Sequence, residues 1–550
     1  MVDLKAAPFH LTEAQLDWVE RTLAAMSPRE KTGQLFVHLS RGFDPAELPR
    51  LKELQPGGIT RFFMGTKDQE CDFLDAAQAQ SNIPMLVSSD LEGSRMSLPF
   101  GAEVPNPLAL AAVNDVAATR KVAQIMAQEA VAMGMNWTFT PVLDINAEFR
   151  SPIVATRGFG SDPATIKEHT LATIEEFQAT GVAATAKHWP GEGHDDRDQH
   201  LVTTRIPLSV EEWKETHGAL YQAAIDKGVL SVMSAHIAFP AYVRQHDPDA
   251  GLEAFRPASV SSLLNLRLLR EEMGFNGVIV SDATSMAGFA AWAPRSEMLP
   301  EAIISGCDVI LFSDDPYQDF GYIDAAIADG RISQARLHDA LRRILGLKAK
   351  LGLHNGAKPA QRDKVGLDQD RQAAMEITAR APTLVKDVGQ TLPISPETTK
   401  RILLISGGVV LPLLPAPLPL DLAQLLRAEG FDVTEHQAGQ LVKSDDWDLV
   451  IYATAEETLL TRGRIFLDWS KLTGGFRSAM ERRWHEVPTI MISFGYPYML
   501  YDAPRVPCYI NAYASMPTMQ TAVVDCLVGR KPFSGQSPVD AFCGLEDARY

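Results

Sequence analysis

The segment Gly181-Val182-Ala183-Ala184-Thr185-Ala186-Lys187-His188 passes from an apolar run to charged residues at Lys187. A short, continuous apolar run of this kind is typical of a strand that is buried on both faces of a parallel sheet. The residues that follow, up to His200, include two further histidines and four acids around a Pro-Gly turn. A loop that only connects two elements needs turn-forming residues and not these ionisable groups. The segment therefore predicts a buried strand that leads into a functional loop.

Similar apolar runs recur along the chain and are separated by helix-length amphipathic sequence. Together with residues 182–187 there are eight of them: Leu35–Leu39, Gly58–Phe63, Ile83–Ser88, Trp137–Leu143, Val182–Lys187, Leu230–Ser234, Gly277–Val280 and Asp308–Phe312. Strands that alternate with helices pair in parallel, and eight such units are the number found in a (β/α)8 TIM-type barrel. An open doubly wound sheet would show the same alternation and stays the alternative. The predicted fold class is α/β.

The second part of the chain predicts a separate domain. The barrel is expected to fill residues 1–353 and to end with a helix over Ser333–Lys350, and residues 354–372 predict a polar linker. Residues 373–550 predict a smaller α/β sandwich domain. Its expected strands are Arg401–Ser406, Asp448–Ala453, Thr489–Phe494 and Val506–Asn511. Four prolines in Leu411–Leu420 exclude a regular helix, so we expect an apolar loop there, packed on the barrel or on a partner subunit.

The composition excludes several classes of function. Of the 550 residues 46% are hydrophobic and 22% are charged, which is typical of a globular protein with a large core. The net charge of −18 argues against nucleic acid or an anionic membrane as partner, because phosphate contacts need clustered Lys and Arg. Five widely spaced cysteines indicate reduced thiols. Residues 1–10 show no signal-peptide pattern and no apolar run is long enough to cross a membrane, so we expect a cytoplasmic protein, as a monomer or a homodimer.

Polar residues follow most of the predicted barrel strands at the point where each strand ends. They are Asp90, Asp144, Lys187, His188, His236 and Asp282, with Arg157 in the loop after the fourth strand. Enzymes with this fold build their active sites at the carboxyl ends of the strands. The sequence therefore predicts a site at that end of the barrel, rich in hydrogen-bonding groups of both signs.

Asp282 and two residues of the loop after the fifth predicted strand, Asp198 and His200, suggest proton transfer or covalent chemistry. Asp198 and His200 flank Gln199, so the carboxylate can fix the tautomer of the imidazole and raise its basicity. The alternative is a polar loop with a locally satisfied histidine. Asp282, at a strand end, can act as a nucleophile on a sugar, as a metal ligand or as a helix N-cap.

Cofactor chemistry finds little support in the sequence. Histidines 188, 194, 200 and 236 could supply metal ligands, but no His-x-His or His-x-x-x-His spacing occurs and Lys187 would repel a cation. Neither a P-loop nor a strand-linked Gly-x-Gly-x-x-Gly motif is present. We therefore expect neither a metal nor a cofactor.

The loop after the fifth predicted strand carries a family signature. Its residues Lys187-His188-Trp189-Pro190-Gly191-x-Gly193-x4-Asp198-x-His200 resemble the K-H-F-P-G-H-G-x4-D-x-H motif of bacterial β-N-acetylhexosaminidases in glycoside hydrolase family 3. Further segments that resemble the family are Ser89-Asp90-Leu91-Glu92-Gly93, Pro141-Val142-Leu143-Asp144, Arg157-Gly158-Phe159-Gly160-Ser161-Asp162-Pro163, Ser234-Ala235-His236 and Val280-Ser281-Asp282-x-x-Ser285-Met286. The resemblance covers roughly residues 20–355.

The resemblance implies a retaining exo-β-glycosidase that releases terminal N-acetylglucosamine from an oligosaccharide or glycoside. Asp282 would be the nucleophile, and His200, oriented by Asp198, the acid/base. The residues expected to hold the sugar are Asp90, Arg157, Lys187, His188, His236 and Met286. A neutral imidazole does not repel an anion, so a glycoside phosphorylase that uses phosphate as acceptor is one alternative. The others are a β-glucosidase or β-xylosidase of the same family and, in another class, a non-catalytic sugar-binding protein.

Three departures from the family pattern matter for the choice of sugar. Glu192 replaces the second histidine of the signature, Ser94 replaces the second glycine of E-G-G, and Leu98 stands where an arginine is frequent. All three lie around the expected sugar pocket, so they bear on which sugar is bound.

Overall fold

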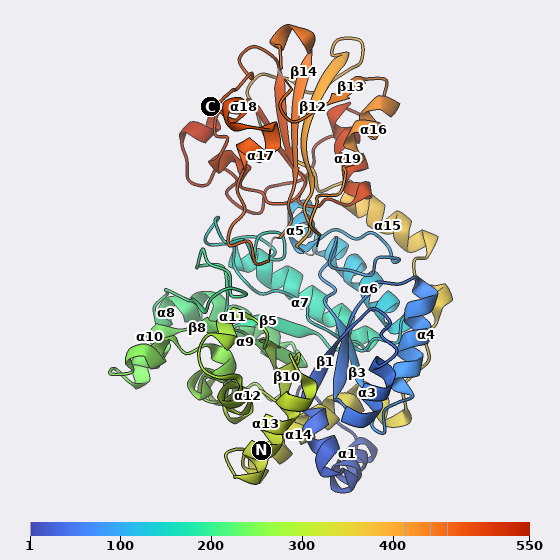
Figure 1. The fold of residues 1–550 in the computed structure, drawn as a ribbon, viewed down its shortest axis with the longest axis vertical. Coiled ribbons are helices and arrows are strands. Elements are labelled where there is room, and N and C mark those ends of the chain that lie inside the picture. Colours follow the sequence, from blue (N-terminus) through green and yellow to red (C-terminus); the bar gives the residue numbers. More distant parts are fainter. Residues whose placement is uncertain (1, 413, 441, 459) are drawn as a thin grey trace.

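The computed structural model describes residues 2–412, 414–440, 442–458 and 460–550, and these form two sheet-based domains (Figure 1). The first domain is built on eight parallel strands in the order β4-β3-β2-β1-β10-β9-β7-β5. Their bounds are β1 Phe36–Arg41, β2 Gly58–Phe62, β3 Leu86–Ser89, β4 Trp137–Thr138, β5 Thr185–Trp189, β7 Ser231–Ser234, β9 Val278–Ala283 and β10 Val309–Leu311.

The sheet closes into a barrel between β4 and β5. Parallel bridges pair Trp137 with Ala183 and Val142 with Lys187, and the amide of Leu143 donates to the carbonyl of Lys187 at 2.7 Å. This closure confirms the predicted barrel and excludes the open sheet. The regular part of β4 is shorter than predicted, because Pro141 has no amide hydrogen to continue the ladder.

Helices surround the barrel, and most begin with the residues that the sequence offers as caps. Thr12, Ser27 and Thr66 each form a capping box with the residue three positions later. The helices are α1 Glu13–Ala25, α2 Pro28–Gln34, α3 Glu47–Leu54, α4 Lys67–Gln78, α5 Pro107–Val113, α6 Val116–Ala132, α7 Pro163–Thr180, α8 Val210–Trp213, α9 Ala219–Asp226, α10 Pro240–His246, α11 Ala287–Ala290, α12 Arg295–Ile304, α13 Pro316–Ala328 and α14 Gln334–Lys350. Among the described residues, no helix is both long and apolar enough to span a bilayer.

The second domain is a six-stranded sheet with helices packed on it, which confirms the predicted α/β sandwich. The strand order is β11-β16-β15-β14-β12-β13, and β11 alone runs antiparallel. The bounds are β11 Thr383–Asp387, β12 Arg401–Val409, β13 Asp432–Glu435, β14 Leu449–Ala455, β15 Thr489–Ser493, β16 Cys508–Asn511, α15 Asp368–Thr378, α16 Leu422–Ala428, α17 Trp469–Thr473, α18 Phe476–Ala479 and α19 Pro517–Leu527. The edge strands β11 and β13 were not predicted, and α15 begins inside the expected linker.

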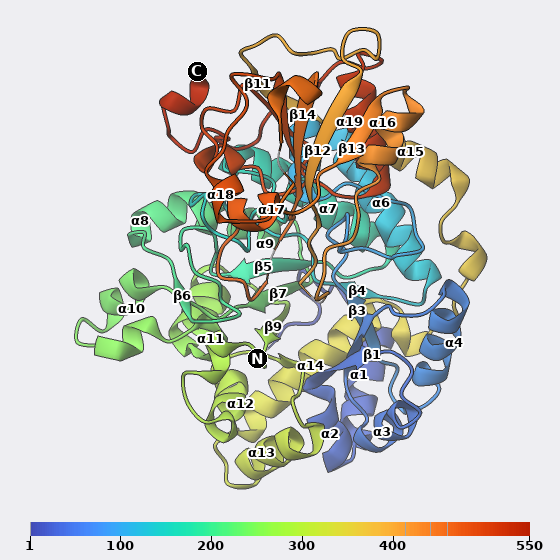
Figure 2. The same ribbon diagram turned by 45° about the horizontal axis from the view of Figure 1, so that its top comes forward.

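The two domains are stacked (Figure 2), and α5 and α6 of the barrel lie close to α15 (Figure 1). The proline-rich segment 411–420, of which Leu413 lies outside the described residues, is not a regular helix. It folds back onto its own domain, where Leu418 exchanges two backbone hydrogen bonds with Val409 of β12. Packing of this segment on the barrel or on a partner subunit stays a prediction.

Candidate active site

The buried Glu92, Arg157 and Lys187 form an ion-pair network with the partly exposed Asp90, beside the ends of β3 and β5. Lys187 Nζ lies 2.7 Å from Asp90 Oδ1 and 2.6 Å from Glu92 Oε1. Arg157 donates both Nε and Nη2 to the Glu92 carboxylate, at 2.8 and 2.9 Å. Burial opposes the ionisation of Glu92, but Arg157 and Lys187 outweigh it and hold its pKa below the ordinary value. Burial likewise opposes the charge on Lys187, but Asp90 and Glu92 outweigh it and raise the pKa of Lys187, so Glu92, Arg157 and Lys187 are charged at neutral pH.

His188 is fixed between this network and Asp144. Its Nδ1 lies 2.6 Å from Asp144 Oδ2 and its backbone amide donates to Asp144 Oδ1 at 3.1 Å. Its Nε2 faces Arg157 Nη2, which can only donate, at 3.3 Å. The ring therefore presents its proton to Asp144 and its lone pair to Arg157. Of the residues predicted to hold a sugar, Asp90, Arg157, Lys187 and His188 thus form one connected group.

Asp282 ends β9 and is buried, with 8% of its surface exposed. Burial opposes its ionisation, but the nearby His188, His236 and His200 and the Ala283 amide outweigh this, and the pKa of Asp282 lies below its ordinary value. The helix-cap alternative is excluded, because α11 begins only at Ala287. Asp282 is therefore an ionised carboxylate at the barrel mouth, as a nucleophile needs to be.

Asp198 and His200 form the predicted dyad, and the second domain joins it. His200 Nδ1 lies 2.7 Å from Asp198 Oδ1, and the His200 amide donates to the same oxygen at 2.8 Å. The amide of Thr461, in the second domain, donates to Asp198 Oδ2 at 2.8 Å. Burial opposes the charge on Asp198, but these bonds and the imidazole lower its pKa. With Nδ1 held by Asp198, Nε2 of the partly exposed His200 is free to transfer a proton.

His236 was expected from the sequence to hold the sugar, but its ring is bonded to protein groups instead. Nδ1 lies 2.9 Å from Ser259 Oγ and Nε2 lies 3.0 Å from the Ala283 carbonyl, so protein groups occupy both nitrogens. His236 is fully buried and supports the backbone next to Asp282. Trp189 is also fully buried and packs edge-on against Trp213 and Tyr221, beneath the loop and away from a pocket.

The remaining predicted residues and the departures lie at the same mouth. Met286 is buried at the start of α11, and its contact with a sugar stays a prediction. Ser94 has a left-handed backbone with φ of 48°, a conformation that glycine adopts readily, which explains why the family has glycine at this position. The Oγ of Ser94 donates to Glu457 Oε1 of the second domain at 2.8 Å. Leu98 is buried. Neither Glu92 nor Thr461 was singled out from the sequence.

One group of side chains could be considered for a metal. Within the described ranges, Asp144, His188 and Glu192 are the group of three whose possible ligand atoms all lie within 4.8 Å of one another. However, the His188 Nδ1 proton is committed to Asp144, and the Arg157 guanidinium lies 3.3 Å from the other ring nitrogen. This donor set does not fit a cation.

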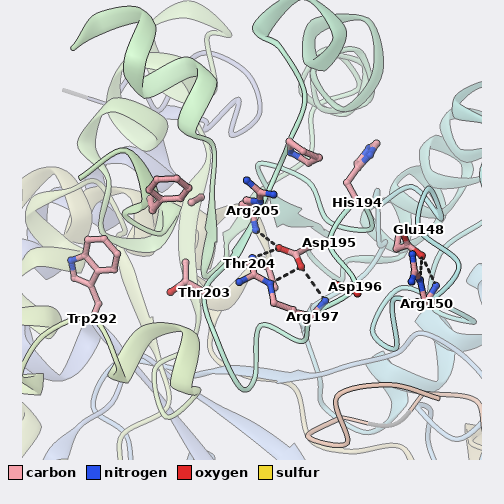
Figure 3. Close-up of a pocket in the computed structure, with 13 residues that line it drawn as sticks. Glu148, Arg150, His194, Asp195, Asp196, Arg197, Thr203, Thr204, Arg205 and Trp292 are labelled. Atoms are coloured by element: carbon pink, nitrogen blue, oxygen red, sulfur yellow. Dashed lines mark hydrogen bonds and ion pairs between the residues drawn. The ribbon is translucent and has the colours of Figure 1, made fainter. Parts of the chain in front are cut away.

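A cavity of about 630 Å³ flanks the dyad loop (Figure 3). Its walls come from loops at the carboxyl ends of the barrel strands and include Arg150, Arg197, Arg205 and Trp292. Arg197 is paired bidentately with Asp195, at 2.8 and 2.5 Å. Asp282, Asp198 and His200 do not line this cavity.

Comparisons with known proteins agree with this geometry. A "Beta-N-acetylglucosaminidase/beta-glucosidase" from Cellulomonas fimi is 39% identical over 565 residues, covering all of both chains. The structure titled "Beta-glucoside phosphorylase BglX bound to 2FGlc" is 34% identical, covers 98% of this chain and 99% of that one, and superposes with a TM-score of 0.93. A glycoside hydrolase family 3 β-N-acetylglucosaminidase from Paenibacillus sp. str. FPU-7 is 25% identical, with coverage of 95% and 100% and a TM-score of 0.82.

Residues 28–347 match the glycosyl hydrolase family 3 N terminal domain, which is more than half of the chain. The match spans the barrel strands that carry the ion-pair network, Asp282 and the dyad. This protein therefore belongs to glycoside hydrolase family 3, as an exo-β-glycosidase built from a barrel and a sandwich domain.

Proposed function

We propose that the enzyme is a retaining β-N-acetylglucosaminidase that releases N-acetylglucosamine from the nonreducing end of oligosaccharides or glycosides. The observation that supports this most directly is an ionised, buried Asp282 at the same barrel mouth as the Asp198–His200 dyad. The names of the similar Cellulomonas fimi and Paenibacillus proteins support the choice of sugar. A cytoplasmic location and a monomeric or homodimeric state belong to the same proposal.

In the first step, an Asp282 oxygen forms a bond to C1 of the sugar while the bond from C1 to the glycosidic oxygen breaks. His200 gives its Nε2 proton to that oxygen, so the aglycone leaves as a neutral alcohol. The Lys187–Asp90 and Arg157–Glu92 pairs and His188 supply fixed donors and acceptors for the sugar hydroxyls.

In the second step, His200 is neutral and takes a proton from water, whose oxygen bonds to C1 as the bond to Asp282 breaks. Two inversions at C1 give net retention. Phosphate is the alternative acceptor, and the observation that favours it is the imidazole itself. A neutral histidine does not repel a phosphate dianion as a second carboxylate would. The product would then be a sugar 1-phosphate.

The test is kcat/KM on an aryl β-N-acetylglucosaminide and an aryl β-glucoside, each with and without phosphate. Preference for the N-acetyl sugar supports the proposal, whereas preference for the glucoside means that the enzyme is a β-glucosidase. A gain in rate with phosphate, with sugar 1-phosphate as product, makes it a phosphorylase. A 2-fluoro sugar should label Asp282; label on another residue of an active preparation would refute the nucleophile assignment, and no turnover would favour the sugar-binding alternative.

A further inference from the structure

Glu192 is held rigidly in the turn that follows β5. The flanking Gly191 and Gly193 have φ values of 128° and 107°. A Cβ atom on Gly193 would lie 1.8 Å from the Ile145 carbonyl oxygen, so the turn packs directly on the loop after β4. The Glu192 amide donates to Asp144 Oδ1 at 2.9 Å. The backbone thus directs a carboxyl side chain that is only 4% exposed into the barrel mouth.

The Glu192 side chain contacts both halves of the site. Its Oε2 lies 3.9 Å from His188 Nδ1 on the sugar-holding side. The same oxygen accepts a 2.9 Å hydrogen bond from Nε2 of Gln199, which is the residue between Asp198 and His200. Gln199 Oε1 in turn accepts from the His236 amide at 3.1 Å, so Gln199 is anchored at both ends of its amide.

The surroundings of Glu192 are acidic. Burial raises its pKa most, Asp144 raises it further, and Asp282 and Asp198 add to this, while Arg157 acts in the opposite direction. The net effect is a pKa well above the ordinary value. Further titratable groups near this turn are His188, Tyr221, His217 and His194. Burial and the neighbouring carboxylates thus favour the protonated form of Glu192, and its Oε1 has no hydrogen-bond partner among the described residues.

We propose that Glu192 is a positioning residue that joins the sugar-holding pair Asp144–His188 to Gln199, and so holds the segment that presents His200 to the leaving oxygen. The link works through the uncharged acid, which accepts from Gln199 without adding a charge beside Asp282. The inference rests on the proposed roles of Asp198 and His200. It goes beyond them by giving a function to the position at which this chain departs from the family signature.

The link has a kinetic signature that depends on the leaving group. A methyl or benzyl glycoside needs the proton from His200, whereas a dinitrophenyl glycoside leaves without it. Loosening the dyad segment should therefore slow the first substrate far more than the second. A defect in sugar binding or in folding would slow both alike.

The experiment compares E192A, Q199A and the double variant E192A/Q199A on a benzyl and a dinitrophenyl glycoside of the preferred sugar. We expect each single variant to lose about 10- to 100-fold in kcat/KM on the benzyl glycoside and less than about threefold on the other. The double variant should be no worse than the poorer single variant, because both remove one link. Additive losses, or equal losses on the two substrates, would overturn the proposal.

The isosteric variant E192Q tests the charge and stays informative if E192A does not fold. We expect it to keep kcat/KM within about threefold and to leave the pH profile unchanged, since it replaces one neutral acceptor with another. A shifted limb of the profile near neutral pH would show that Glu192 is ionised and overturn the proposal. E211Q, at an exposed position of α8, is the matched control. The two proposals can be refuted separately. A 2-fluoro adduct on a residue other than Asp282 in the wild-type enzyme would refute the proposed function. The kinetic comparison of the variants tests only the role of Glu192.

Discussion

Replacing Asp198 with asparagine tests how the dyad is built, because this carboxylate accepts three hydrogen bonds. Oδ1 takes the amide and Nδ1 of His200, at 2.8 and 2.7 Å, and Oδ2 takes the Thr461 amide at 2.8 Å. An asparagine has a single oxygen. It can keep both bonds to His200 only if its NH2 group faces the Thr461 N–H. D198N should therefore preserve the tautomer of His200 while losing the negative charge and the contact to the second domain.

The expected cost follows from these three bonds. Charge-assisted bonds to His200 become neutral ones, which loses about 1–2 kcal/mol. The opposed N–H groups leave a buried donor unpaired, which costs roughly 1–2 kcal/mol more. If the sum acts on the transition state, about 2–4 kcal/mol corresponds to a fall in kcat/KM of about 30- to 1,000-fold.

The assay is kcat/KM for D198N on a benzyl glycoside, with a dinitrophenyl glycoside as the substrate that needs no proton. T461A is the matched control, because it keeps the amide that Asp198 accepts. It should stay within about twofold of wild type. D198N activity within threefold of wild type would refute the dyad. An equal loss on both substrates would show that Asp198 serves sugar binding or folding and not proton transfer.

Three further predictions concern groups outside the dyad. E92Q should lower the free energy of unfolding by roughly 3 kcal/mol and raise KM, because it leaves the buried Arg157 and Lys187 without a full counter-charge. Urea unfolding measures the change in stability and steady-state kinetics measure KM. An unchanged urea midpoint would contradict the prediction. E457A should increase amide exchange at Thr461 and lower kcat/KM, because Glu457 accepts hydrogen bonds from Ser94 and Asn106 across the domain contact and from Ser515 within its own domain; S94A, which removes only one of these donors, should have a smaller effect. K348M should stabilise the protein most at pH 6, because burial lowers the pKa of Lys348 from 10.5 to about 7. Between about pH 7 and 10 the unfolded chain binds a proton that the folded chain lacks, so the contribution of Lys348 to wild-type stability rises with pH over that range. Thermal melting at pH 6 to 9 measures this. If the melting temperature of K348M depended on pH as steeply as that of wild type, the lowered pKa of Lys348 would be contradicted.

The barrel could be predicted because each buried parallel strand leaves an apolar run in the sequence and chemistry gathers at the strand ends. The edge strand β13, Asp432–Glu435, is short and only one of its four residues is buried, so it leaves no such run. The antiparallel edge strand β11 was missed for a similar reason, since Leu384, Val385 and Asp387, three of its five residues, are not buried. Local pattern predicts central strands better than edges.

The site could be predicted only as far as residue type carries information. Asp282, Asp198 and His200 could be singled out because their side chains are of types that can carry out the proposed chemistry. Thr461 was not, because it contributes a backbone amide from a position 263 residues away, and any residue except proline has that group. Glu92 lay in a quoted motif, but its role depends on Arg157, 65 residues further along, and this pairing appears only in the folded barrel.

The charges around Asp282 suggest why a histidine acid/base and a glutamate at position 192 occur together. In the proposed glycosyl-enzyme, Asp282 is esterified and uncharged, and Asp198 is compensated by its bonds to His200 and Thr461. An ionised Glu192 would add a negative charge near Asp282, and this charge would repel an incoming phosphate. In the neutral form that we propose, Glu192 lacks that charge and still accepts the hydrogen bond from Gln199. If phosphate is the acceptor, adding a fixed negative charge near this position should therefore reduce the phosphate-dependent rate more than the rate with water.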